Sequence, residues 1–303
     1  MVAIVGFGHG LTLVAQSGHN GHFRPDCLPS RHTPLPWLIV FDSLLVASRG
    51  DSAFRIIKTA KRMGVHTIAI YTDADADLPY VAKAHEAIRI PSASDDPYLN
   101  VAAIVDAARR TNARAIHPGD GPLALDVDFA QRVIDEGMAW VGPKPKTMRQ
   151  LADRDELRES LAQAGVLVTD GEDAAAGRHQ VEVQVLGLAD GCTVAISGRD
   201  CCSKDSYQDG TTSGDLCQAI CDATARVGKA LKFRSAGTFR FLVEDSTGTL
   251  YFQQVDPVVP IESLESLPDS KIDSVEQQLL IAAGQSPSFE PKQLAELELV
   301  NSG

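Results

Sequence analysis

The chain has 303 residues, of which 44% are hydrophobic and 22% charged, and its formal net charge is −12. This length predicts two globular units, each with its own hydrophobic core. The acidic balance argues against a nucleic-acid partner, because phosphate binding requires clustered lysine and arginine. No apolar run reaches the roughly 18 to 20 residues that cross a bilayer, so we expect no membrane-spanning helix. The six cysteines form no disulfide-scaffold pattern, which favours reduced thiols in a cytoplasmic protein.

The first segment with regular periodicity begins at residue 37. Residues 1–36 carry scattered Gly, Pro and His without sustained periodicity, and we expect an N-terminal extension there that is disordered in part. From 37 to 147, apolar strand patterns alternate with helical patterns such as DSAFRIIKTAKRMG. Strands that alternate with helices imply crossover connections, so this range is predicted to form a doubly wound α/β domain with a parallel sheet.

The second half of the chain has a different pattern. Residues 148–180 are expected to form a helix followed by a short bridge, and residues 181–290 to form paired strands backed by helices. One hairpin is expected to turn at Asp190-Gly191 and another at Ser246-Thr247-Gly248, because these residues tolerate the backbone of tight turns. The prediction is an α+β unit distinct from the first, followed by a tail over 291–303.

Long segments of the chain resemble biotin carboxylase, the ATP-grasp component of biotin-dependent acyl-CoA, pyruvate and urea carboxylases. The first half carries the resemblance in LLVASRGDSAFRIIKTAKRMGVHTIAIYTDADADLPYVAKAHEAIRI, YLN and AIHPGDGPLALDVDFA. The second half carries it in GRHQVEVQVLG, GRDCCS, SAGTFRFL and YFQQVDPVVPIES. The resemblance implies a pre-ATP-grasp domain over 37–147 and a truncated ATP-grasp-like domain over 181–290.

The chemistry that the resemblance implies is phosphoryl transfer from ATP to bicarbonate, followed by transfer of CO2 from carboxyphosphate to biotin. Such chemistry depends on positioning and on cations that neutralise developing charge. It therefore needs a phosphate-covering lid loop with its lysine, Mg²⁺ ligands, and basic side chains around the anions. Between Val168 and Val181 only twelve residues remain where the family has its lid, so we expect this chain to lack the lid.

The family's metal ligands are also changed. Its two metal-holding glutamates correspond to Arg240 and Gln254, and the neighbouring asparagine to Asp256. A cation and a neutral amide do not replace carboxylates around a hard divalent ion, and Arg240 is expected to repel that ion. We therefore expect no metal and no cofactor to bind, although the family uses ATP and Mg²⁺.

The anion-binding positions differ as well. The bicarbonate arginine corresponds to Val258 and a glutamine to Pro260, while Glu262 stands at the place of the general base. The family's basic stretch has Tyr207 at a histidine position and Asp209 at a lysine position.

Two basic residues stay in candidate positions. Arg154 keeps a positive charge at a nucleotide-contacting lysine position, or is a plain exposed helical arginine. His117 falls where the carboxyl edge of the parallel sheet is expected, where such sheets bind ligands; the alternative is a hydrogen-bonded histidine at a strand end.

Three functions fit these observations. In the first, a biotin carboxylase-like protein has lost ATP-dependent carboxylation and serves as a binding or regulatory protein, as a homodimer or with a carboxylase-like partner. In the second, the chain is an ATP-independent enzyme for a small organic substrate, using Asp256, Glu262, His117 and Tyr207 as acid and base groups in an inter-domain cleft. In the third, the chain retains weak carboxylase activity or reflects an imperfect gene model, although a skipped exon would not explain Arg240 or Gln254.

Overall fold

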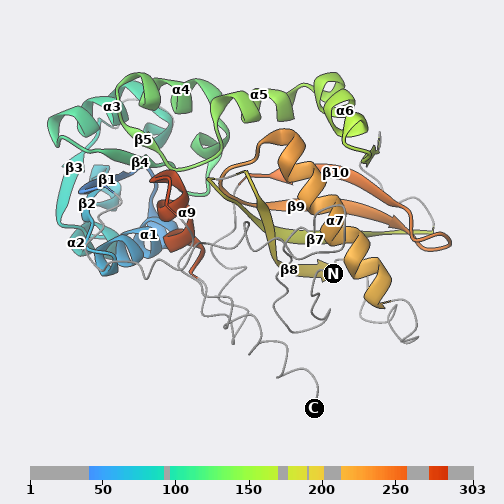
Figure 1. The fold of residues 1–303 in the computed structure, drawn as a ribbon. Helices are drawn as coiled ribbons and strands as arrows, with labels where there is room; N and C mark the ends of the chain where they lie inside the picture. The colour runs from blue at the N-terminus through green and yellow to red at the C-terminus, as the bar shows by residue number, and fades with distance from the viewer. Residues whose placement is uncertain are drawn as a thin grey trace, which may run out of the picture.

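The computed structural model describes residues 41–91, 96–169, 177–189, 191–200, 213–257 and 273–285. Within these ranges the chain builds two five-stranded sheets, one in each half, with helices packed on them (Figure 1). No helix in the described ranges has both the length and the apolar character needed to cross a membrane.

The first sheet is parallel throughout, with the strand order β3-β2-β1-β4-β5. Its strands are β1 (Ser43–Val46), β2 (His66–Tyr71), β3 (Glu86–Arg89), β4 (Ala115–His117) and β5 (Ala139–Trp140). Its helices are α1 (Gly50–Arg62), α2 (Pro79–Lys83), α3 (Val101–Arg110) and α4 (Val127–Asp135). The order reverses beside β1, as in a doubly wound sheet, which confirms the predicted fold class of this half.

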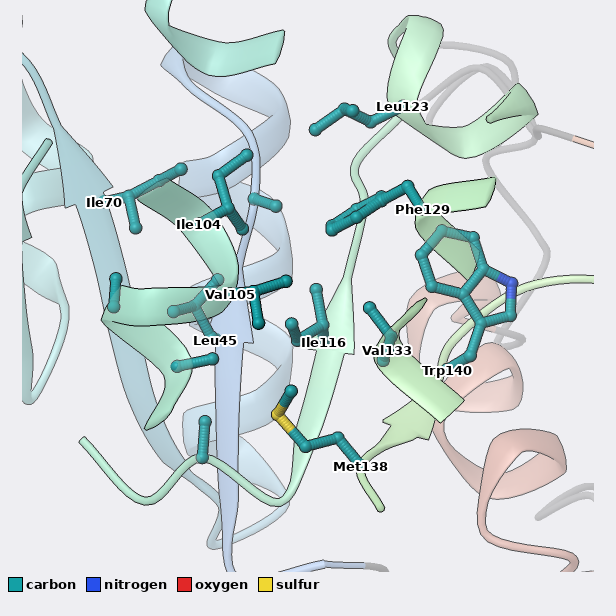
Figure 2. Packing of buried hydrophobic residues seen from close by; sticks show 14 of the residues in the cluster. Leu45, Ile70, Ile104, Val105, Ile116, Leu123, Phe129, Val133, Met138 and Trp140 are labelled. Atoms are coloured by element: carbon teal, nitrogen blue, oxygen red, sulfur yellow. The ribbon is translucent and has the colours of Figure 1, made fainter. Parts of the chain in front are cut away.

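Helices cover both faces of this sheet, and successive strand residues point to opposite faces. In β1, Leu45 joins the core under α3 and α4, whereas Leu44 and Val46 join the core under α1. Figure 2 shows the first of these cores, in which Phe129 and Trp140 meet edge to face at 5.5 Å between ring centroids. The sheet is therefore a rigid layer between two apolar cores.

Local sequence signals set the helix ends. Asn100, Asp126 and Asp153 each accept a hydrogen bond from a backbone N–H in the first turn of the helix that follows. These side chains satisfy donors that have no partner within the helix. After α1, Gly64 takes a positive φ of 80°, a conformation that favours glycine and lets the chain turn into β2.

The second sheet has the strand order β6-β10-β9-β7-β8. Its strands are β6 (Leu167–Val168), β7 (Arg178–Gly187), β8 (Thr193–Asp200), β9 (Ala236–Glu244) and β10 (Leu250–Asp256). The two predicted hairpins appear as antiparallel β7–β8 and β9–β10 pairs, and Gly191 and Gly248 take positive φ. Strand β6 pairs in parallel with β10, so the sheet is mixed.

The segment that joins the two sheets differs from the single helix expected. It forms two helices, α5 (Pro145–Ala152) and α6 (Arg154–Gln163), which are separated at Asp153. Asp153 has extended backbone angles and caps α6, so it ends one helix and begins the next. Together with α7 (Ser213–Leu231), α6 covers one face of the second sheet over a core that includes Val181, Val183, Phe239 and Phe241.

The last described helix, α9 (Ser274–Ala282), lies against the first half of the molecule (Figure 1). Its Val275 and Leu279 belong to the same core as the apolar residues of α1. Polar contacts reinforce this packing: Asp273 accepts hydrogen bonds from Thr59 and Arg62, and Glu276 accepts one from Arg62. The chain thus returns from the second sheet to close over the first domain.

Candidate functional site

The face of the second sheet opposite α6 and α7 carries polar side chains. Along β7, Val181 and Val183 point into the core, so Glu182 between them points to the opposite face. Arg240 of β9 lies directly across from Glu182 on one side and from Gln254 of β10 on the other. Register therefore places these three side chains in one row across three strands.

Arg240 bridges two carboxylates on this face. Its Nε lies 2.9 Å from Glu182 Oε1, and its Nη2 lies 2.7 Å from Asp256 Oδ2. Gln254 Nε2 donates to the other Asp256 oxygen at 3.2 Å. The side chains of Glu182, Arg240 and Asp256, which we call the Arg240 triad, are 27%, 31% and 36% exposed. The triad is therefore half-buried, where its ion pairs are stronger than on an open surface.

The surroundings of Asp256 disfavour its charged form. Burial is the main cause that raises the pKa of this carboxyl, and the nearby negative charge of Glu182 raises it further. Arg240 and the hydrogen bond from Gln254 act in the opposite direction without cancelling the rise. The positive charge of Arg240 thus favours the ionised form of Asp256, while burial and Glu182 oppose it.

The donor set on this face does not suit a divalent metal ion. The guanidinium of Arg240 already lies within 2.9 Å of both carboxylates, and a metal bound there would face its positive charge at close range. Among the described residues, no group of three or more His, Cys, Asp or Glu side chains is placed to hold a metal ion. The residues present therefore do not fit the metal that the family resemblance implies.

Arg154 lies at the start of α6, on the surface. Its Nη1 donates to the backbone carbonyl of Gln253 in β10 at 3.2 Å. This bond ties the helix to the strand that also carries Gln254 and Asp256. Arg154 thus has a structural partner, and the nucleotide contact proposed for it stays a prediction.

His117 lies at the carboxyl end of β4 and is buried. Its Nδ1 accepts a hydrogen bond from the backbone N–H of Gly119 at 3.0 Å. The neutral ring then carries its proton on Nε2, which donates to Gln278 Oε1 of α9 at 3.2 Å. Burial lowers the pKa of His117 to about 4, although Gln278 and Asp120 act in the opposite direction. These bonds are those of a neutral histidine that links β4 to α9.

Two buried tyrosines at this edge of the first sheet are also hydrogen-bonded. Tyr98 donates from its hydroxyl to Asp75 at 2.6 Å and lies 2.9 Å from the hydroxyl of Tyr80. The guanidinium of Arg49 lies over the ring of Tyr98, 5.3 Å from its centroid. Burial is the main cause that raises the pKa of the Tyr98 phenol. Both tyrosines are therefore held as neutral phenols in a bonded network.

The predicted site residues do not assemble into one group among the described residues. Asp256 lies beside Arg240, whereas His117 bonds Gly119 and Gln278 and shares no partner with Asp256. Tyr207 and Glu262 lie outside the described residues, as do Asp209, Val258 and Pro260.

Sequence reasoning missed two partners, Glu182 of the triad and Gln278 of α9. The alternation of Val181, Glu182 and Val183 indicates that Glu182 faces away from the core. Its pairing with Arg240 depends on the β7–β9 register, which no local pattern specifies. Gln278 lies 161 positions from His117 in the chain, and no sequence signal joins the two residues.

Comparison with known proteins finds that the chain is similar to carboxylases. The family described as biotin carboxylase, N-terminal domain, matches residues 40–148. The chain is 29% identical to the methylcrotonoyl-CoA carboxylase subunit alpha, mitochondrial, of Oryza sativa subsp. japonica over 80% of this chain and 43% of that protein. It is 27% identical to biotin carboxylase 2 of Bacillus subtilis over 84% of this chain and 74% of that protein.

A solved structure of a carboxylase is also similar to this chain. The Kluyveromyces lactis urea carboxylase superposes with a TM-score of 0.72 at 31% identity, over 83% of this chain and 22% of that one. The chain therefore spans less than half the length of the rice and Kluyveromyces relatives.

The alignments also locate a difference inside the matched span. The rice subunit aligns over 319 positions and the Bacillus protein over 330, both more than the 303 residues of this chain. Each relative therefore has residues within the aligned span that this chain lacks. Domain match, sequence similarity and fold agree: the chain carries a biotin carboxylase N-terminal domain and is a homologue of biotin carboxylases and biotin-dependent carboxylases.

Proposed function

We propose that this chain is a biotin carboxylase-like protein that does not carry out ATP-dependent carboxylation and acts as a non-catalytic binding protein. The observation that carries the proposal is the short connection between β6 and β7. Thr169 donates its backbone N–H to Phe252, and Gly177 accepts from Asp245. Both ends of the connection are thus fixed to the second sheet, and seven residues join them.

Seven residues are too few for a folded lid. A subdomain with its own core needs several tens of residues, and the resemblance assigns to the lid the glycine-rich loop and the lysine that cover the ATP phosphates. Relatives align over more positions than this chain has residues, which supports an internal loss. Without a lid, bound phosphates stay exposed to water and lose the enclosure that phosphoryl transfer uses.

The Arg240 triad supports the same proposal. Phosphoryl transfer by this family needs a cation between the ATP oxygens and protein carboxylates. Here Glu182 and Asp256 are already paired with Arg240. An ATP-dependent reaction would therefore lack both its phosphate cover and its metal ligands.

Direct binding of Mg-ATP tests this proposal. In isothermal titration calorimetry we expect no micromolar binding of Mg-ATP to the full chain, because the groups that contact its phosphates are absent or neutralised. Biotin carboxylase 2 of Bacillus subtilis serves as the positive control. Micromolar affinity for Mg-ATP, together with bicarbonate-stimulated turnover, would overturn the proposal.

The binding partner belongs to the same proposal. We expect a cytoplasmic protein that pairs with a second copy of itself or with a carboxylase-like protein. Analytical ultracentrifugation of the chain, alone and mixed with a carboxylase, measures both. A strict monomer that forms no complex would contradict the proposed pairing. It would not bear on the proposed loss of carboxylation.

A repurposed enzyme gains no comparable support from the described residues. His117 uses both ring nitrogens in hydrogen bonds to Gly119 and Gln278, and Asp256 is engaged by Arg240 and Gln254. Neither group presents a free acid or base to a substrate. We therefore propose one function.

A further inference from the structure

We propose that Arg240 is a built-in cation that replaces a divalent metal ion on the polar face of the second sheet. The guanidinium joins Glu182 of β7 to Asp256 of β10, with β9 between them. This inference deepens the proposed function and rests on it for the interpretation of this face as a former nucleotide surface. We infer in addition that Arg240 hinders the binding of a divalent metal ion to this face.

The geometry of Arg240 suits a bridge between strands. Its Nε points to Glu182 at 2.9 Å and its Nη2 to Asp256 at 2.7 Å, so different nitrogens of one planar group serve the two carboxylates. A guanidinium presents several donors in a fixed plane, whereas an ammonium is a single compact charge. The arrangement thus holds three neighbouring strands together through one side chain.

Without Arg240, Glu182 and Asp256 would face each other as like charges in a half-buried position. The negative charge of Glu182 already raises the pKa of Asp256, and Arg240 opposes that rise. The positive charge of Arg240 between the two carboxylates relieves this repulsion. In this chain the protein itself supplies that charge.

A divalent ion would have to compete with bonds that are already formed. Asp256 Oδ2 is taken by Arg240, and its Oδ1 accepts from Gln254 at 3.2 Å. Glu182 Oε1 is taken by Arg240 Nε. An incoming ion must break these bonds and approach the guanidinium at short range, which costs free energy in a partly desolvated site.

The experiment compares Mn²⁺ binding by the full-length wild type with that of Arg240→Ala. Electron paramagnetic resonance counts free Mn²⁺, and thermal unfolding is followed with and without Mn²⁺. We expect no Mn²⁺-dependent stabilisation of the wild type through this face. In Arg240→Ala the two carboxylates are released, and we expect Mn²⁺ to raise the Tm by about 2–5 °C.

Two further variants keep the test decisive. The double variant Arg240→Ala/Asp256→Asn lacks one of the released carboxylates, so we expect Mn²⁺ not to raise its Tm. Any rise that remains in this variant measures non-specific binding of Mn²⁺ to the acidic chain. Arg240→Gln repeats the measurement if Arg240→Ala does not fold.

Two results would overturn the inference. One is Mn²⁺ binding by the wild type that Asp256→Asn weakens about tenfold or more, because Arg240 would then leave the metal site open. The other is a folded Arg240 variant that gains no Mn²⁺-dependent stabilisation. Neither result requires ATP turnover, so failure of this inference is distinguishable from failure of the proposed function.

Discussion

At the scale of single residues, His117 shows how burial fixes a protonation state. The pKa of about 4 in the fold lies below the ordinary value of about 6.5, so the folded chain favours the neutral ring. Between these values the unfolded chain binds more protons at this residue than the folded chain does. The contribution of His117 to stability is therefore complete above about pH 6.5 and is lost as the pH falls towards 4.

Replacing His117 tests this pH dependence. In His117→Gln an amide can accept from Gly119 and donate to Gln278, but it does not titrate. We expect the free energy of unfolding to fall less steeply from pH 7 to 4.5 than in the wild type, with a difference of up to ~3 kcal/mol over the full shift. Urea unfolding at several pH values measures it.

The matched control for this experiment is His66→Gln. The side chain of His66 is 51% exposed, so this variant reports the effect of the same replacement at a surface histidine. If His117→Gln and the wild type show the same dependence, His117 is not held neutral by the fold.

At the scale of elements, the packing of α7 on β8 depends on Gly228, which has no side chain. A Cβ at Gly228 would lie 1.9 Å from Thr193 Oγ1 and 2.4 Å from Thr193 Cβ. Thr193 is buried and has a branched side chain with little freedom to move aside. Glycine at position 228 therefore allows the helix and the strand to approach closely.

We expect Gly228→Ala to destabilise the chain by about 1–3 kcal/mol, since overpacking outweighs the gain in helix propensity. Urea unfolding gives the value. Gly121→Ala is the matched control, because a Cβ there meets no atom within 4 Å, and it should leave stability nearly unchanged. Equal stability of Gly228→Ala and the wild type would mean that α7 packs less tightly on β8 than described.

The position of α9 depends on Asp273, which links this helix to α1. Asp273 accepts from the backbone N–H groups of Val275 and Glu276 and also from Thr59 and Arg62. Burial alone raises the pKa of Asp273, but these hydrogen bonds outweigh it, so the net pKa is lowered. The stability that Asp273 supplies is present at neutral pH and is lost as acid protonates the carboxyl.

The variants Asp273→Ala and Asp273→Asn separate the two roles of this residue. Alanine removes the helix cap and the charge, so we expect a loss of about 2–3 kcal/mol. Asparagine keeps the cap and loses the charge, and about half that loss is expected. Hydrogen exchange of α9 amides should rise more in the alanine variant. Identical protection in both variants would show that the cap contributes nothing to docking.

At the scale of the whole molecule, local patterns predicted the regular part of the fold. Alternating strand and helix signals predicted the parallel sheet, and the predicted turns at Gly191 and Gly248 are present, each with a positive φ at the glycine. The split between α5 and α6 was missed, because the capping role of Asp153 appears only when its extended backbone is known. The docking of α9 was also missed, because it depends on contacts between residues more than two hundred positions apart.

The candidate site was predictable only in part, for the same reason. The chemical identity of Arg240 and Gln254 predicts a poor metal site, and this stays a prediction. The bridge to Glu182 depends on the pairing of strands β7 and β9, which are separated by 58 positions at this contact. The register between distant strands brings Arg240 next to Glu182, and the sequence alone does not specify that register.

We propose above all that the chain does not carry out ATP-dependent carboxylation. The most direct measurement is bicarbonate-dependent ADP release by the full chain with Mg-ATP and free biotin, beside biotin carboxylase 2 of Bacillus subtilis as a positive control. We predict that bicarbonate produces no increase in ADP release by this chain. A reproducible bicarbonate-stimulated rate, lost when biotin and Mg²⁺ are withheld, would contradict the claim.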